Sequence, residues 1–320
     1  MANVIVTGGA GFIGSHLCDA LLEKGYDVVC IDNFLTSSEE NIAHLKDNPH
    51  FTFINHDVIK PLPDNLHAEY VFHLASPASP NHHSKISYHN LPMETMQVNT
   101  NGTLNILQFA AAQNAKFLFT STSEVYGDPL EHPQKESYRG NVSTIGPRAV
   151  YDEAKRFGET LVSYFWREKN VDARIARIFN TYGPRMSKDD MRMITIFINQ
   201  ALANEPLTIY GDGKQTRSLS YVSDTVEGLM RLMFHDNTRG EVVNIGSANE
   251  HTVLEYAELV KRLADSTSEI TFSEQLPEDD PLRRRADIAK AKELLDWEPE
   301  VPLEEGIKKM IEYVKKVQVS

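Results

Sequence analysis

The chain has 320 residues, 41% of them hydrophobic and 24% charged, a composition typical of a folded globular protein. Its 45 acidic and 32 basic side chains give a net charge of −13, which argues against binding to nucleic acid or to an anionic membrane, because both are polyanions. No run approaches the roughly 18 apolar residues of a membrane helix, and no basic leader precedes the first apolar run, so we predict a cytoplasmic protein. Cys18 and Cys30 are too few for a disulfide framework or a zinc site, and we predict that both lie in the core.

Strand-length apolar runs alternate with helix-length amphipathic segments through the first half of the chain. We predict strands over 4–6, 28–31, 51–54, 70–74, 116–120 and 173–179, and helices over 12–24, 94–113 and 149–168. This alternation indicates an α/β fold with a doubly wound parallel sheet. Later, Gly and Pro break the pattern into short pieces, for example over 277–281, so we predict a first domain over 1–180 and a smaller substrate domain over 181–320. A further strand over 241–245 is expected to rejoin the large sheet.

A glycine-rich segment follows the first predicted strand and opens the first predicted helix. Gly8 permits a tight turn, Gly11 lets a pyrophosphate approach the backbone, and Gly14 lets the helix pack closely on the strand. The positive N-terminus of that helix then faces the phosphates. A glycine motif alone is weak evidence, and the alternative is a turn that binds nothing. Its position between a strand and a helix is nevertheless the context of a Rossmann dinucleotide-binding domain.

The second predicted strand leads into Asp32, an acid in the position that binds the adenosine ribose of a dinucleotide. Its carboxylate can accept hydrogen bonds from ribose hydroxyls, and its charge would repel a 2′-phosphate. We therefore predict that the cofactor is NAD rather than NADP. The cofactor-binding residues predicted in these two segments are Gly8, Gly11, Phe12, Ile13, Gly14, Asp32 and Asn33.

Tyr151 and Lys155 lie four residues apart, on one face of the helix predicted over 149–168. The ammonium would favour the phenolate and lower the pKa of the tyrosine, which could then remove a substrate hydroxyl proton while hydride leaves the same carbon. This spacing is common by chance, and the alternative is a half-exposed tyrosine beside a solvated lysine. Here, however, the polar segment 120–127 precedes it at the end of the fifth predicted strand, where ligands bind in such sheets.

Together these motifs resemble the extended short-chain dehydrogenases/reductases, and within them the UDP-glucuronate decarboxylases. The resembling segments are 7–14, 74–80, 121–129, 146–156, 176–185, 215–217 and 297–299, so the likeness runs over nearly the whole chain. It implies that NAD stays bound through turnover. The positions matching Asp57 and Val58 flank adenine in that family. Those matching Leu74 and Ala75 lie along the cofactor, and those matching Tyr151 and Lys155 also contact it.

The resemblance also implies a reaction centre and a substrate. The residues matching the reaction centre are Thr122, Glu124, Tyr151, Lys155 and Arg284. Those matching the site for a UDP-sugar are Ser123, Asn180, Arg185, Arg192, Tyr210, Gln215, Arg217 and Arg284. The implied reaction oxidises C4 of UDP-glucuronate, loses carbon dioxide from the resulting beta-keto acid, and returns hydride to give UDP-xylose. The helices over 94–113 and 149–168 resemble those through which the family forms homodimers.

Three other functions fit parts of this pattern. A nucleotide-sugar 4,6-dehydratase, acting for example on dTDP-glucose, shares every step up to the 4-ketone. Such enzymes typically carry an aspartate where this chain has Ser123, and a serine is a poor acid for protonating the departing C6 hydroxyl. A 4-epimerase usually lacks the acid at the position of Glu124. An NAD-binding scaffold without catalysis is opposed by the presence of every expected catalytic residue type.

Two segments depart from the family pattern. The segment 81–90 is longer than its usual counterpart and follows a loop that should border the sugar, so it bears on substrate choice. Its histidines lack zinc-type spacing, so we predict a solvated loop there and no metal site in the chain. Arg285 and Ala286 stand where Lys-Pro often follows the key arginine, Arg284, and this would loosen the loop that carries it.

Overall fold

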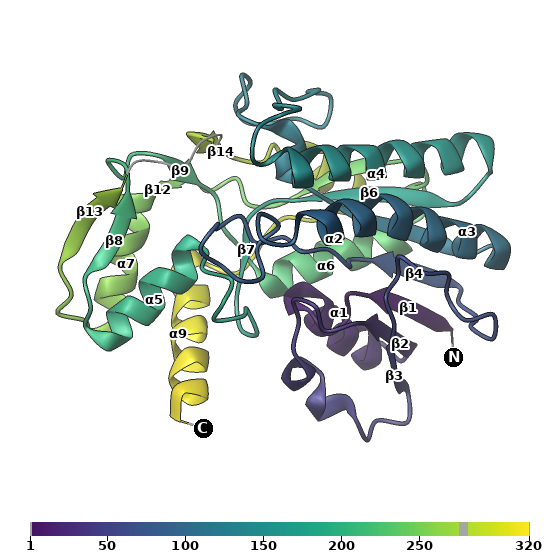
Figure 1. Cartoon of the computed structure of the whole chain (residues 1–320), viewed down its shortest axis with the longest axis horizontal. Helices are drawn as coiled ribbons and strands as arrows, with labels where there is room; N and C mark the ends of the chain where they lie inside the picture. The colour runs from purple at the N-terminus through teal and green to yellow at the C-terminus, as the bar shows by residue number, and fades with distance from the viewer. Residues whose placement is uncertain (1, 275–280, 320) are drawn as a thin grey trace.

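Seven parallel strands form the central sheet of the structure, a computed structural model that describes residues 2–274 and 281–319 (Figure 1). In spatial order they are β11 (Val242–Ile245), β6 (Ala173–Ile178), β5 (Lys116–Thr122), β4 (Tyr70–His73), β1 (Asn3–Thr7), β2 (Asp27–Asp32) and β3 (Phe51–Asn55). The six strands predicted in the first half are confirmed, and the strand predicted over 241–245 is β11, which pairs with β6. Positions 277–280 of the predicted break lie outside the described residues.

The strand order reverses beside β1, and this reversal marks the ligand-binding edge of the sheet. β2 and β3 extend from one side of β1, whereas β4, β5 and β6 extend from the other. In doubly wound sheets a crevice opens outside the carboxyl ends of the strands at such a point. The predicted cofactor residues Gly8 and Leu74 directly follow β1 and β4, so the fold brings them to this crevice.

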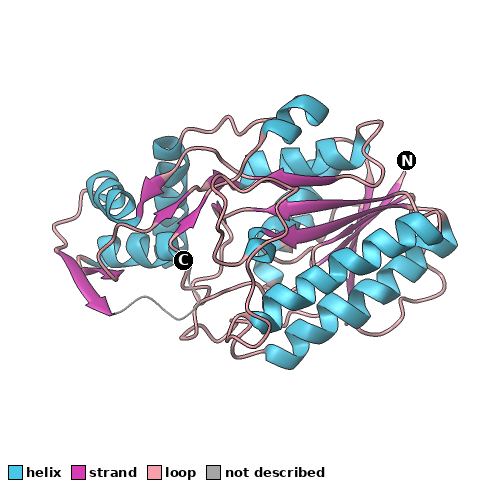
Figure 2. Cartoon of the chain, turned by 90° about the horizontal axis from the view of Figure 1, so that it is seen from above, coloured by secondary structure: helices cyan, strands magenta, loops and turns pink. Residues whose placement is uncertain are grey.

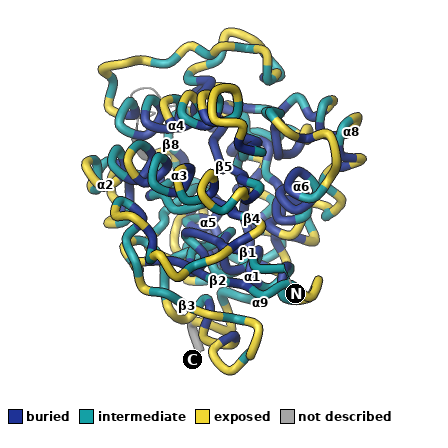
Figure 3. Tube along the Cα trace, turned by 90° about the vertical axis from the view of Figure 1, so that its right-hand side faces the viewer, coloured by how far each residue is buried: buried dark blue, intermediate teal, exposed yellow. Residues whose placement is uncertain are grey.

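Both faces of the sheet are buried, because the strand residues alternate between two hydrophobic cores. In β1, Val4 and Val6 belong to one core and Ile5 to the other. The covering helices are α1 (Phe12–Glu23), α6 (Val222–Phe234) and α8 (Ala289–Leu295) on the first side and α2 (Pro92–Gln97), α3 (Thr103–Gln113) and α4 (Ala149–Glu168) on the second. Figure 2 shows the long helices running along the sheet, and Figure 3 shows the buried strands between α3 and α6. Cys18 and Cys30 lie in the first core and are fully buried, as predicted.

The helix predicted over 94–113 is present but is not uniform. It begins as α2 with Pro92 in its first turn, where the missing N–H costs nothing, and ends as α3. Between them lies a π-helical turn over Val98–Gly102, a feature that is frequent near functional sites. At this turn Gly102 approaches Val58, one of the predicted adenine-flanking residues. The other long helix, α4, has the predicted bounds.

A smaller group of elements lies beside the carboxyl edge of the sheet, on the left of Figure 1. It contains α5 (Met193–Ala203), β8 (Leu207–Tyr210), α7 (Val253–Ala264), β13 (Ile270–Glu274) and α9 (Leu303–Val319), and the short strands β7 (Thr181–Tyr182), β9 (Thr216–Arg217), β10 (Ser220–Tyr221), β12 (His251–Thr252) and β14 (Arg283–Arg284). Because β11 is a strand of the large sheet and α6 and α8 pack on that sheet, the second half of the chain contributes to both parts of the fold. None of the helices in the described ranges is both long and apolar enough to cross a lipid bilayer.

Candidate active site

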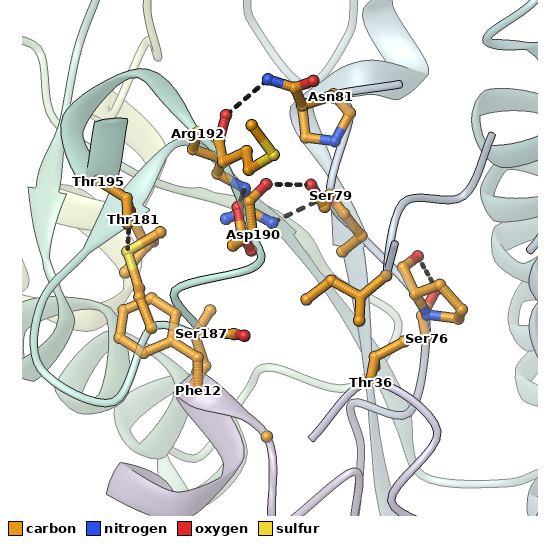
Figure 4. A pocket seen from close by; sticks show the side chains of 18 of the residues that line it. Phe12, Thr36, Ser76, Ser79, Asn81, Thr181, Ser187, Asp190, Arg192 and Thr195 are labelled. Carbon is orange, nitrogen blue, oxygen red and sulfur yellow. Dashed lines mark hydrogen bonds and ion pairs between the residues drawn. The ribbon is translucent and has the colours of Figure 1, made fainter. Parts of the chain in front are cut away.

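A cavity of about 1390 Å³ opens at the carboxyl edge of the sheet, beside the smaller group of elements. Every residue predicted from the sequence to bind the cofactor, to bind the substrate or to take part in the chemistry lines this cavity. The first of these residues is Gly8 and the last is Arg284, so the cavity gathers segments from almost the whole chain. Figure 4 shows part of its wall. The predicted residues therefore form one site in space.

The glycine-rich loop at one end of the cavity depends on the absence of side chains. Gly8 has a φ of 72°, which favours glycine, and a Cβ there would lie 2.7 Å from the backbone nitrogen of Ala75. A Cβ on Gly14 would overlap the carbonyl oxygen of Gly8. Gly11 precedes α1 without a side-chain cap, so the N–H groups of the first helical turn stay available. A pyrophosphate fits this helix N-terminus.

Asp32 is fixed at the end of β2, next to the glycine-rich loop. Its Oδ2 accepts a hydrogen bond from the backbone N–H of Ala10 at 3.1 Å. Its Oδ1 accepts from the N–H of Phe34 at 2.9 Å and from the hydroxyl of Ser37 at 2.7 Å. A carboxylate oxygen has more than one acceptor site, so a ribose hydroxyl can still bind. The open loop and the fixed acid together fit NAD.

Tyr151 and Lys155 share a face of α4, but the predicted effect of the lysine on the tyrosine is wrong. Burial raises the pKa of Tyr151, the charge of Glu124 raises it further, and a hydrogen bond with Thr122 opposes both. The lysine Nζ lies 5.9 Å from the centre of the tyrosine ring and donates to the backbone oxygen of Thr120 at 2.8 Å. Burial also lowers the pKa of Lys155 to about 7, so at neutral pH its charge is only partial. The partial charge of Lys155 therefore does not offset the effect of burial on the pKa of Tyr151.

Glu124 lies at the centre of a buried cluster of charges. Its Oε2 is 2.7 Å from Nη2 of Arg148, and its Oε1 is 3.6 Å from Nη1 of Arg284. Burial alone would raise the pKa of Glu124, but the two guanidinium groups outweigh burial and lower the pKa to about 2. Burial and the charge of Glu124 raise the pKa of the neighbouring Asp152 to about 9. At neutral pH the two carboxyl groups therefore hold one proton between them, on Asp152.

Tyr88 connects this cluster to the tyrosine of the reaction centre. Its hydroxyl donates to Oε2 of Glu124 at 3.1 Å. Its ring stacks on that of Tyr151, with centroids 4.8 Å apart and planes 5° apart. The segment 81–90 is thus not simply the predicted solvated loop, because Tyr88 and Ser84 are buried while His83 is exposed. The described part of the chain contains no cluster of three or more His, Cys, Asp or Glu suited to a metal ion.

The chain just before this segment meets a loop of the second half across the cavity wall (Figure 4). The hydroxyl of Ser79 donates to the backbone oxygen of Asp190 at 2.5 Å. Arg192 forms an ion pair with the side chain of Asp190 at 3.0 Å and donates to the backbone oxygen of Ala78 at 2.9 Å. The guanidinium predicted to bind the nucleotide therefore also holds the two loops together.

Several substrate candidates carry buried polar atoms without a partner among the described residues. They include Nη1 of Arg185, Oε1 of Gln215 and Nε of Arg284. Arg185 also forms an ion pair with Asp19 of α1 at 2.7 Å, and the amide nitrogen of Gln215 donates to the backbone oxygen of Tyr210 at 2.8 Å. Buried polar atoms are normally hydrogen-bonded. All three lie on residues that line the cavity, so a polar ligand fits there.

The sequence analysis missed three residues of the charged cluster: Tyr88, Arg148 and Asp152. Arg148 and Asp152 flank Tyr151 inside the resembling segment 146–156, so charges of both signs beside the expected base were a usable signal. Tyr88 gave no such signal, because Glu124 is 36 residues away from it in the chain. Only the folded structure shows that its ring and hydroxyl reach the reaction centre.

The sequence profile of the family described as GDP-mannose 4,6 dehydratase matches residues 5–310, and the chain belongs to this family of extended short-chain dehydrogenases/reductases. UDP-glucuronic acid decarboxylase 1 of Arabidopsis thaliana is 52% identical over 309 residues, which cover 97% of this chain and 69% of the relative. UDP-glucuronic acid decarboxylase 1 of Xenopus tropicalis is 49% identical over 314 residues, which cover 98% and 72%. The crystal structure of UDP-glucuronic acid 4-epimerase from Bacillus cereus with UDP-glucuronic acid and NAD matches with a TM-score of 0.85 and 31% identity, over 98% of this chain and 99% of the epimerase.

Proposed function

We propose that this protein catalyses the NAD-dependent decarboxylation of UDP-glucuronate to UDP-xylose through a 4-keto intermediate. The observation that carries the proposal is the placement of Glu124, a buried acid held by two arginines close to Tyr151 in a cavity with a dinucleotide-binding loop. The curated relatives that share about half of the sequence are named for this reaction.

The first half of the reaction is oxidation at C4 of the sugar. NAD held at the glycine-rich loop would supply a hydride acceptor for C4. Tyr151 takes the proton of the C4 hydroxyl, and Thr122 orients the phenol oxygen through its hydrogen bond. Burial and the charge of Glu124 raise the pKa of Tyr151, and the hydrogen bond with Thr122 opposes them, so Thr122 helps the phenol to act as a base. Lys155 adds a partial positive charge nearby.

The second half is loss of carbon dioxide and protonation at C5. The C6 carboxylate is beta to the new ketone, so the electron pair of the broken C5–C6 bond is delocalised into an enolate. Tyr151 and Thr122 donate hydrogen bonds to the oxygen that becomes negative. Glu124 and Arg284 organise the delivery of a proton to C5. Return of hydride to C4, and of the proton from Tyr151 to the C4 oxygen, completes UDP-xylose.

Ser123 supports decarboxylation over 4,6-dehydration. It is buried and lines the cavity at the end of β5. A carboxylate in its place would repel the C6 carboxylate of UDP-glucuronate by about 4 kcal/mol at ~4 Å and an effective dielectric constant of 20, before screening. A hydroxyl avoids this repulsion, and it is too weak an acid to expel the C6 hydroxyl of a dehydratase substrate.

A 4-epimerase is the second candidate, because a UDP-glucuronic acid 4-epimerase shares the fold over nearly the whole chain. An epimerase also oxidises C4, but it leaves the C5–C6 bond intact and needs no protonation at C5. The buried, doubly paired Glu124, which lies beside the protonated Asp152, is therefore the observation that favours decarboxylation.

We assign the nucleotide to the second half of the chain. In this proposal Asn180, Arg185, Arg192, Tyr210, Gln215 and Arg217 hold the diphosphate and the uracil. The unpartnered buried atoms of Arg185 and Gln215 support it. The same proposal divides the chain into a cofactor-binding domain over 1–180, which the strand near 241–246 rejoins, and a nucleotide-sugar-binding domain over 181–320.

We further propose a homodimer, located in the cytoplasm, that pairs through the helical segment 94–113, which runs from α2 to α3, and through α4. On α4, Phe157 is 50% exposed and Tyr164 is 44% exposed. Aromatic side chains on a helix surface are typical of residues that a partner covers. Light scattering at working concentration should give twice the chain mass of 36.1 kDa, and a single-chain mass would contradict the dimer.

The decisive experiment incubates the protein with UDP-glucuronate and, separately, with UDP-glucose, and identifies the products by mass and chromatography. We expect UDP-xylose from the first substrate and no product from the second. UDP-galacturonate from the first would indicate an epimerase, and loss of water from the second a dehydratase.

In the same assay Glu124→Gln should retain NAD binding but lose most turnover. Normal product formation by that variant would remove Glu124 from the chemistry.

A further inference from the structure

A buried glutamine holds the segment that carries Arg284. Gln134 is completely buried. Its side-chain Oε1 accepts a hydrogen bond from the backbone N–H of Arg285 at 2.9 Å. Its backbone N–H donates to the backbone oxygen of Arg285 at 3.0 Å, and its backbone oxygen accepts from the backbone N–H of Asp287 at 2.9 Å. Three hydrogen bonds therefore fix the backbone immediately after Arg284.

Asn244, a residue of β11 in the large sheet, also holds the backbone of Gln134 and of the segment after Arg284. Its Nδ2 donates to the backbone oxygens of Gln134 and Asp287 at 3.0 and 3.1 Å. Its Oδ1 accepts from the hydroxyl of Tyr126 at 2.8 Å. The side chain is completely buried with both donors and its acceptor in use. An apolar residue of similar size would remove all three of these hydrogen bonds.

The network continues to the helix that carries the reaction-centre tyrosine. Nη1 of Arg177 donates to the hydroxyl of Tyr126 at 3.0 Å. Its Nε and Nη2 bind the two carboxylate oxygens of Glu159 at 2.9 and 2.7 Å. Glu159 lies one helical turn after Lys155 on α4. A continuous chain of hydrogen bonds thus links α4 with the segment of Arg284.

The guanidinium of Arg284 is attracted to Glu124 by its charge but makes no close hydrogen bond to it. Its Nη1 is 3.6 Å from Oε1 of Glu124, longer than a hydrogen bond, and its Nε has no partner among the described residues. Its exact position therefore also depends on the backbone, which pairs with Arg217 on one side and is fixed through Gln134 on the other. The hydrogen bonds of Gln134 oppose the loosening that Ala286 was expected to cause.

We propose that Gln134, supported by Asn244, is a positioning residue for Arg284 and thereby decides whether a turnover runs to UDP-xylose or stops at the 4-ketone. The proposal rests on the proposed function, in which Tyr151 serves oxidation at C4 and Arg284 serves protonation at C5. With Arg284 displaced, the C4–H and C5–C6 bonds still break. The enolate then takes its C5 proton from solvent, and the resulting ketone leaves before hydride returns. The two electrons from C4 stay on the cofactor as NADH, beside one carbon dioxide.

The test replaces Gln134 and follows both products. Gln134→Leu removes the amide at similar volume, and Gln134→Glu keeps an oxygen for the N–H of Arg285. With UDP-glucuronate and NAD, we expect Gln134→Leu to raise the ratio of 4-ketopentose with NADH to UDP-xylose by about tenfold, while the single-turnover rate of NADH formation changes by less than about threefold. Gln134→Glu should restore most of the original ratio.

Two comparisons separate positioning from general damage. Gln200→Leu removes an amide whose Oε1 also accepts from a backbone N–H, that of Thr208 at 3.1 Å, and should leave the product ratio unchanged. Hydrogen exchange of the Arg285 amide, measured without ligands, should become faster in Gln134→Leu. If that variant does not fold, Asn244→Asp keeps the acceptor for Tyr126 but loses two donors, and should raise the ratio several-fold.

The outcomes distinguish this inference from the proposed function. A wild-type protein that makes no UDP-xylose would contradict the proposed function itself. If the wild type makes UDP-xylose and Arg284→Ala raises the ketone ratio, but Gln134→Leu lowers both products equally, Gln134 is only structural and the inference is overturned. If both variants raise the ratio and the double variant raises it no further, Gln134 acts through Arg284.

Discussion

The cofactor side and the substrate side of the cavity are built in different ways. On the cofactor side, Gly8, Asp32 and Leu74 end or directly follow neighbouring strands, and backbone shape does most of the binding. On the substrate side, short strands bring distant residues together, as where Arg217 of β9 pairs with Arg284 of β14. Binding there depends on side-chain charge. Substitutions on the two sides should therefore have different effects. On the cofactor side they should distort the glycine-rich loop, and on the substrate side they should lower the affinity for the substrate.

The largest effect is expected at Tyr151, where the two sides meet. Tyr151→Phe removes the phenol oxygen but keeps the ring that stacks on Tyr88. We expect kcat to fall about 10²- to 10⁴-fold, the usual contribution of a general acid or base, with NAD binding retained. Steady-state kinetics and NAD titration measure this. Tyr164→Phe, the same change at an exposed position of α4, is the control and should be active. Near-normal turnover by Tyr151→Phe would refute its role.

On the substrate side, Arg217→Ala should raise KM for the UDP-sugar about 10- to 100-fold, because a hydrogen bond to a charged group contributes about 1.5–3 kcal/mol. NAD affinity should not change. Arg262→Ala is the matched control, since Arg262 forms an exposed ion pair with Glu304 and should leave KM unchanged. An equal loss of NAD and substrate affinity in Arg217→Ala would mean that the two sides are not independent.

On the cofactor side, Gly14→Ala should destabilise the protein by about 1–3 kcal/mol, the usual result of placing extra atoms in a filled space, and should weaken NAD binding. The added Cβ would overlap the carbonyl oxygen of Gly8. Gly11→Ala is the comparison, because its Cβ would lie 3.1 Å from the same oxygen, and it should cost less stability. Chemical denaturation measures both, and the reverse order would contradict the steric explanation.

The last effect is on stability alone, and it comes from His73, the buried last residue of β4 next to the cofactor side. His73 bridges the hydroxyls of Thr7 at 2.7 Å and Thr103 at 3.2 Å, and burial lowers its pKa from 6.5 to about 3. Between these values the unfolded chain binds the extra proton, so stability falls as pH decreases below 6.5. At pH 5 the loss is about 2 kcal/mol relative to pH 8. Urea unfolding of His73→Gln should show a correspondingly weaker pH dependence. An unchanged dependence would exclude His73 as the cause.

The cofactor side was the more predictable one, for a physical reason. Gly8, Asp32 and Leu74 each end or directly follow a strand, so local sequence order already indicates where they lie. The bounds of α4 and the strands around Gly8 and Asp32 followed from apolar periodicity and the glycine spacing. The π turn over Val98–Gly102 did not, because it leaves the apolar pattern of a helix almost unchanged.

The electrostatics of the reaction centre could not be predicted in the same way. The acidity of Tyr151 depends on burial and on the charge of Glu124, and neither follows from its spacing to Lys155. The contacts of Tyr88 and Gln134 join segments that are far apart in the chain. Family resemblance located most residues of the cavity but gave no account of what holds them in place.

The position of β11 affects how the chain folds while it is being synthesised. β6 ends at Ile178, but the strand that covers its outer edge, β11, is made only after α5, β8 and α6. A nascent chain therefore exposes the outer edge of β6 until residue 245 has left the ribosome, and such exposed edges readily pair with other chains. A fragment that ended near residue 180 would contain every glycine of the dinucleotide loop and would still be prone to aggregate.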